Sequence, residues 1–100
     1  MERIYNVVNE NATALVLANP GTMEEKIYFI RDVITSSSGA WFRSDVNLPR
    51  GTPTIVFLQL KYGMEIKYVR VKFYGKVVRC ESGGFGIAFE MGATYHGRNS

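Results

Sequence analysis

The sequence has few of the residues that most catalytic and metal centres need. Its 100 residues include one cysteine, Cys80, and one histidine, His96. One cysteine cannot form an intramolecular disulfide or a zinc cluster, and a lone thiol is typical of a reducing compartment. His96 lies in a polar tail, and no two carboxylates have the spacing of an acid–base pair. We therefore expect no enzyme activity and no bound metal.

Long apolar runs and helical periodicity are also scarce. No segment approaches the roughly 20 apolar residues that span a bilayer, and the N-terminal stretch is too polar for a signal peptide. Ile4, Val7 and Val8 have the spacing of one short helix face, which Asn11 ends. We therefore expect a cytoplasmic protein that does not insert into a membrane and has little helix.

The rest of the chain has the pattern of β-strands. Short segments of β-branched and aromatic residues end at Gly, Pro, Asn or Ser turns. With 46% hydrophobic residues and a net charge of +3, the 100 residues have the composition of a single globular domain, 1–100. The expected strands are 12–18, 26–34, 39–44, 54–62, 66–80 and 85–90, followed by a frayed tail over 91–100. Six such strands predict an all-β fold, a small antiparallel barrel.

Two of these strands have distinctive patterns. Segment 54–62 is apolar on both faces, as expected of a strand that crosses the core. In 66–80 the alternation is interrupted near Gly75, where we expect a bulge. Before that point one face holds Tyr68, Arg70, Lys72, Tyr74 and Lys76. Interleaved aromatic and basic residues can bind single-stranded nucleic acid, although cross-strand packing and protection of an exposed strand explain them more simply.

The order of the central motifs resembles a PilZ domain. Ser36-Ser-Ser-Gly39 leads into the aromatic segment Ala40-Trp-Phe42, and Leu48-Pro-Arg-Gly-Thr52 follows. Later, Phe73-Tyr-Gly-Lys-Val-Val-Arg79 and Gly84-Phe-Gly-Ile-Ala-Phe89 are similar to the closing segment of that family. The resemblance covers residues 26–90 and implies a six-stranded antiparallel PilZ-type β-barrel.

PilZ domains are typically receptors for cyclic di-GMP, so the resemblance implies a nucleotide site. The family binds through an Asx-x-Ser-x-x-Gly motif and an Arg-x-x-x-Arg pair. Ser36 and Gly39 match the first motif, but Ile34 stands at the Asx position, and Arg3 is followed by Val7 where the second arginine is expected. Each lost charge-assisted hydrogen bond is worth about 1.5–3 kcal/mol, against about −8 kcal/mol for a micromolar ligand. We expect weak or no nucleotide binding.

The resemblance therefore favours an adaptor role. Stand-alone PilZ-like proteins of type IV pilus assembly lack the arginine pair and bind protein partners, and this chain resembles them in size. We expect a non-catalytic adaptor without a cofactor, in bacterial cyclic di-GMP-linked signalling, motility or pilus biogenesis. The expected partner-binding residues are Trp41, Phe42, Leu48, Arg50, Tyr68, Arg70, Lys72 and Tyr74.

Two alternatives are kept open. The first is a true cyclic di-GMP receptor with an atypical site made by Arg3, Arg31, Ser36 and Gly39. The second is a barrel that binds single-stranded nucleic acid through the Tyr, Arg and Lys face of 66–80, which is the less favoured partner. For Trp41 a place in the barrel core is the competing interpretation, because alternation alone does not orient its side chain.

Overall fold

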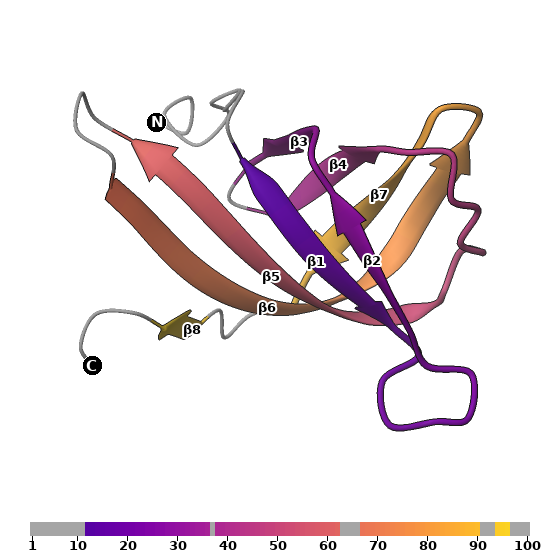
Figure 1. Cartoon of the computed structure of the whole chain (residues 1–100). Helices are drawn as coiled ribbons and strands as arrows, with labels where there is room; N and C mark the ends of the chain where they lie inside the picture. Colours follow the sequence, from indigo (N-terminus) through magenta and orange to yellow (C-terminus); the bar gives the residue numbers. More distant parts are fainter. Residues whose placement is uncertain (1–11, 37, 63–66, 91–93, 97–100) are drawn as a thin grey trace.

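The computed structural model is an antiparallel all-β domain (Figure 1). The structure describes residues 12–36, 38–62, 67–90 and 94–96. Its strands are β1 (Thr13–Ala18), β2 (Lys26–Ile30), β3 (Val33–Thr35), β4 (Gly39–Arg43), β5 (Pro53–Tyr62), β6 (Lys67–Glu81), β7 (Gly84–Phe89) and β8 (Thr94–His96). The predicted all-β antiparallel fold is confirmed. The N-terminal helix face and Arg3 lie outside the described residues.

The strands form a single sheet that curls into a half-barrel (Figure 1). Their order in the sheet is β2-β1-β5-β6-β7-β4-β3, and β8 pairs with β6. The two ends of this order, β2 and β3, are consecutive in the chain, and only Arg31 and Asp32 separate them. The sheet must therefore curl until its first and last strands meet at this corner.

Three local features differ from the predicted strands. The segment 26–34 is divided into β2 and β3, because the exposed Arg31 and Asp32 carry the chain from one end of the sheet order to the other. The tail expected to fray contributes β8. The register shift of β6 lies between Val77 and Arg79, not at Gly75. Gly75 is needed for close packing, since a Cβ there would lie 2.5 Å from the carbonyl oxygen of Ala88.

The core lies inside the curl of the sheet. Phe42 and Phe85 are fully buried at its centre, and their rings stack with centroids 5.1 Å apart. Leu48, in the loop between β4 and β5, is also buried, with 4% of its surface exposed. The prediction that Phe42 and Leu48 belong to a partner-binding surface is therefore wrong, because both side chains are part of the core.

Strand β5 is buried on one face only. Thr54, Val56 and Leu58 point into the core, and the Thr54 hydroxyl donates a hydrogen bond of 3.0 Å to the carbonyl oxygen of Gly75. Ile55 is half-buried and Phe57 is 41% exposed, both on the outer face. The prediction that this strand crosses the core with both faces buried is thus wrong, and its second apolar face lies at the surface.

Candidate functional site

The outer surface of four neighbouring strands carries a continuous group of apolar side chains. Strand pairing aligns one row across β2, β1, β5 and β6 as Phe29, Leu15, Phe57 and Lys72. The next row is Ile27, Leu17, Ile55 and Tyr74. We call the apolar members of both rows the outer apolar face: Leu15, Leu17, Ile27, Phe29, Ile55, Phe57 and Tyr74.

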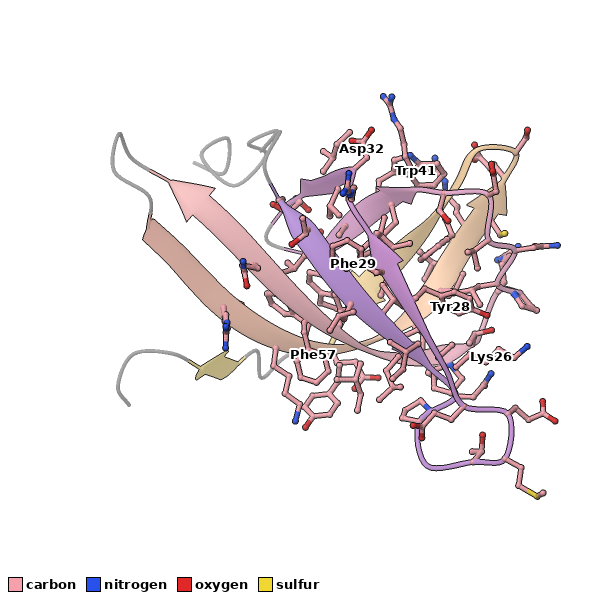
Figure 2. All side chains as sticks on the ribbon, viewed as in Figure 1. Lys26, Tyr28, Phe29, Asp32, Trp41 and Phe57 are labelled. Carbon is pink, nitrogen blue, oxygen red and sulfur yellow. The ribbon has the colours of Figure 1, made fainter. Side chains whose placement is uncertain are left out.

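This face is open to water. Phe29 is 60% exposed and Ile27 63%, while the side chains from the inner strands, Leu15, Phe57 and Tyr74, are 41–43% exposed. Figure 2 shows Phe29 and Phe57 on the ribbon of this part of the sheet. Contiguous exposed apolar surface is typical of places where a protein contacts another molecule.

A groove in the outer apolar face has basic side chains along one wall. It encloses about 600 Å³ and is lined by Leu15, Phe29, Phe57, Arg70 and Lys72, together with neighbouring residues of β1, β5 and β6. The ammonium of Lys72 lies 5.7 Å from the centre of the Phe57 ring and 5.1 Å from that of Tyr74. The lysine therefore places a positive charge directly beside the apolar floor.

Strand β6 orients its residues as the alternation predicts. Val71 and Val77 are buried, whereas Arg70, Tyr74 and Lys76 are exposed. Tyr74 thus belongs to the outer apolar face, with Arg70 and Lys72 at its border, and whether the three residues bind a partner stays a prediction. The side chain of Tyr68 lies outside the described residues.

Sequence reasoning missed the part of this face that β1, β2 and β5 provide. Leu15, Phe29 and Phe57 were all within predicted strands, and the apolar residues on both faces of 54–62 were the available signal. This pattern of apolar residues is ambiguous, because a strand covered on both sides and a strand with one exposed apolar face have the same sequence pattern.

A second cavity, the Trp41 cavity, lies over β4 and β7. It encloses about 330 Å³, and its lining includes Ser36, Gly39, Trp41, Arg79 and Gly86. The Arg79 guanidinium lies 5.0 Å from the centre of the Trp41 ring, and its Nε also lies 3.2 Å from a carboxylate oxygen of Glu81. A planar ring and a guanidinium side by side are groups that could bind a planar anion.

Trp41 is half-buried on the outer surface, so its assignment to the barrel core is wrong. It pairs across the strands with Gly86, and its ring covers β7 where that strand has no side chains. A Cβ at Gly84 would lie 2.6 Å from Cζ2 of the indole, and one at Gly86 would lie 3.3 Å from Cε3. The two glycines of β7 therefore make room for the indole.

The serine–glycine turn before β4, residues 36–39, has a structural role. The Ser36 amide donates a hydrogen bond of 2.9 Å to the Gly39 carbonyl, and the Ser36 hydroxyl donates one of 3.3 Å to the same oxygen. A Cβ at Gly39 would collide with the carbonyl oxygen of Ile87. Ser36 thus bonds within the turn, Gly39 allows β4 to approach β7 closely, and both residues also line the Trp41 cavity.

Of the other residues predicted for an atypical nucleotide site, only Arg31 is described by the structure. Arg31 is exposed between β2 and β3 and does not line the Trp41 cavity, and Arg3 lies outside the described residues. Arg79 and Trp41 line it instead. Arg50, expected on a partner-binding rim, is exposed in the loop between β4 and β5.

The described residues contain no cluster of three or more His, Cys, Asp or Glu side chains that could hold a metal ion. Cys80 is half-buried, as its place in a strand suggests, and its thiol donates a hydrogen bond to Oδ1 of Asn47 at 3.1 Å. Within the same described ranges, no helix is long and apolar enough to cross a membrane.

Comparison with known proteins gives this chain no relative: no family model, no curated protein and no solved structure matches it. The structure itself shows an antiparallel half-barrel with an exposed apolar face and a small arginine–tryptophan cavity. The resemblance to PilZ domains stays a prediction that rests on the sequence motifs.

Proposed function

We propose that this chain is a non-catalytic, PilZ-like adaptor domain that binds a protein partner in the bacterial cytoplasm, in cyclic di-GMP-linked motility or type IV pilus biogenesis. The outer apolar face carries this proposal. Its five most exposed side chains come from four strands and are 41–63% exposed. Covering apolar surface is favourable by about 25 cal/mol per Å², so a partner that covers this face gains binding free energy.

The chemistry of the outer apolar face suits a protein more than a small polar ligand. Its centre is aliphatic and aromatic, and its charged residues, Arg70, Lys72 and Lys76, lie toward one border. An apolar centre with charged residues at the rim is the usual composition of a protein–protein contact. Aromatic side chains and arginine are its usual anchors.

A crosslinking experiment tests the adaptor role. A photoreactive phenylalanine analogue is placed at position 57, inside the outer apolar face, or at position 78, where Val78 is similarly exposed (46%) but lies beside the Trp41 cavity. In cells of the source bacterium, we expect a discrete crosslinked protein from position 57 and none of that mass from position 78. Identical products from both positions, or none from position 57, would contradict the proposal.

The Trp41 cavity supports a second candidate, a cyclic di-GMP receptor with an atypical site. A guanine base could stack on the Trp41 ring while the Arg79 guanidinium contacts a phosphate. We favour this candidate less, because Glu81 already pairs with Arg79 and the Ser36 hydroxyl already bonds within its turn.

Calorimetric titration with cyclic di-GMP at physiological salt separates the two candidates. The adaptor proposal predicts no binding heat up to about a hundred micromolar nucleotide. Low-micromolar binding that is lost in Arg79→Ala and in Ser36→Ala would establish the receptor instead. Trp41 is the single tryptophan of the chain, so its fluorescence provides an independent reading of the same cavity.

A further inference from the structure

We infer that the outer apolar face binds an amphipathic helix of the partner protein, with acidic residues flanking the apolar stripe of that helix. The inference rests on the proposed adaptor function and specifies which kind of partner segment the face accepts. The dimensions of the face, the distribution of charge around it and the position of Lys72 support this inference.

The dimensions of the face match a short helix. Each row crosses four strands and is about 14 Å long, since neighbouring strands are about 4.8 Å apart. The two rows are two residues apart along each strand, or about 7 Å. A helix of about ten residues is about 15 Å long and presents an apolar stripe of similar width. The groove of about 600 Å³ between Leu15, Phe29 and Phe57 receives the protruding side chains of that stripe.

The charged side chains on the strands of the face are mainly basic. Strands β1, β2 and β5 contain no Asp or Glu, and β6 has only Glu81 at its last residue. Arg70, Lys72 and Lys76 alternate with Val71, Phe73 and Gly75, so their side chains leave β6 on the same outer face as Tyr74.

The nearest carboxylates that the structure describes follow or precede strands: the amide of Glu90, just after β7, donates to the Tyr74 carbonyl oxygen at 2.7 Å, and Glu24 and Glu25 lie in the loop before β2. A segment that covers the apolar rows therefore meets three cations along β6, Arg70, Lys72 and Lys76, against one described carboxylate, Glu90, beside Tyr74, so the charge at this border is positive on balance. Carboxylates on its flank complement that charge.

Lys72 joins the apolar and the basic parts of the face. Its ammonium lies over the Phe57 and Tyr74 rings, at 5.7 and 5.1 Å from their centres. A partner side chain packed on Phe57 therefore has a cation beside it, within reach of a Glu or Asp one turn further along the same helix. This is the helix-in-groove mode of recognition, in which apolar residues at i, i+3 or i+4 and i+7 anchor the segment.

A second copy of this chain fits the face poorly. Two copies paired with β6 opposite β6 would bring the Arg70, Lys72 and Lys76 groups of one copy toward those of the other, and a pairing with β6 opposite β2 would offer these cations no carboxylate on that strand. Like charges brought together at a contact oppose association. The chain as a whole carries a net charge of +3, which adds to the same repulsion.

Anionic membranes and single-stranded nucleic acid are also attracted by basic residues, but they fit the apolar part less well. Nucleic acid gains its affinity by stacking bases on aromatic rings, whereas the centre of this face includes the aliphatic Leu15, Leu17 and Ile55. A bilayer surface is flat at this scale, whereas the face is hollowed by its groove.

The test is selection from a phage library of random 16-residue peptides on the immobilised full chain. Selected peptides are synthesised and their affinities measured by fluorescence anisotropy. We expect sequences with apolar residues at helical spacing and flanking Glu or Asp. Their affinity should fall at least tenfold in Phe57→Ser and stay within twofold in the matched control Val78→Ser. Lys72→Glu should weaken an acidic peptide about fivefold and strengthen its Glu-to-Lys analogue, with Arg50→Glu as the control.

The outcomes separate the inference from the proposed function. Peptides that require Phe57 but lack acidic residues or helical spacing overturn the helix inference and leave the adaptor function standing. Failure to select any Phe57-dependent peptide overturns the helix inference, and the crosslinking experiment from position 57 decides the adaptor function separately. Binding to phosphatidylglycerol vesicles or to oligothymidylate that is lost in Phe57→Ser would also overturn the inference and assign the face to a membrane or to nucleic acid.

Discussion

The Arg79 guanidinium carbon lies 5.0 Å from the centre of the Trp41 ring on the outer surface of the half-barrel. Trp41 belongs to β4 and Arg79 to β6, and β7 separates these strands in the sheet. The contact across β7 forms because Gly86, opposite Trp41, has no side chain to keep the two groups apart. A cation over an exposed aromatic ring contributes about 0.5–1 kcal/mol.

We expect Gly84→Ala to destabilise the domain by about 1–3 kcal/mol. The new methyl group would lie 2.6 Å from both the Phe42 carbonyl oxygen and Cζ2 of Trp41, and the backbone oxygen cannot move aside. Urea denaturation followed by the fluorescence of Trp41 measures the change. Gly86→Ala is the control and should cost less, since its nearest neighbour is a side-chain atom at 3.3 Å. Equal effects would contradict this account of the Trp41 packing.

Two phenylalanines distinguish the core from the outer apolar face. Phe42 is fully buried and stacks on Phe85, so Phe42→Ala should lower the free energy of unfolding by about 3–5 kcal/mol. Phe29 is 60% exposed, so Phe29→Ala should change it by no more than about 0.5 kcal/mol. Thermal unfolding of the two variants checks the contrast. A large loss of stability in Phe29→Ala would mean that this residue supports the fold and is not available to a partner.

Thr54 holds a buried hydrogen bond between β5 and β6. Its hydroxyl is 3.0 Å from the Gly75 carbonyl oxygen, and the residue is 3% exposed. Thr54→Val keeps the shape and removes the donor, so we expect a loss of about 1 kcal/mol in urea denaturation. Thr22→Val removes an exposed hydroxyl that donates to the Asn19 carbonyl at 2.8 Å, and a smaller loss is expected there. An unchanged free energy of unfolding in Thr54→Val would show that this hydrogen bond adds no net stability.

Ser36 should act on the turn and not on nucleotide binding. Its hydroxyl donates to the Gly39 carbonyl at 3.3 Å in a partly buried position, so Ser36→Ala should cost about 0.5–1 kcal/mol of folding free energy. The heat on adding cyclic di-GMP should be the same as for the unchanged chain. Ser82→Ala, at an exposed position of the turn between β6 and β7, is the control for stability, because the Ser38 hydroxyl lies 3.5 Å from that of Ser36.

Several parts of the fold were predictable because they depend on local chemistry. The strand boundaries follow from turn residues such as Pro20 and Gly21, and the orientation of residues 70–74 follows from their alternation. The division of 26–34 was not predictable, because the break at Arg31 and Asp32 contains no glycine or proline. The break is caused by the closure of the sheet: β2 pairs with β1 at one end of the strand order, and the next strand of the chain, β3, pairs with β4 at the other end.

The all-β class and the alternation along the first part of β6 follow from the amino-acid sequence, because each depends on residues close together in the chain. Only the tertiary structure decided which apolar residues are core and which are surface. Phe42 and Phe57 lie in similar strands, yet one faces the inside of the curl and the other faces water. Which face of a strand is buried depends on pairings between strands that are distant in the sequence, such as β1 with β5, and on how the sheet bends. The outer apolar face therefore exists only in the assembled half-barrel.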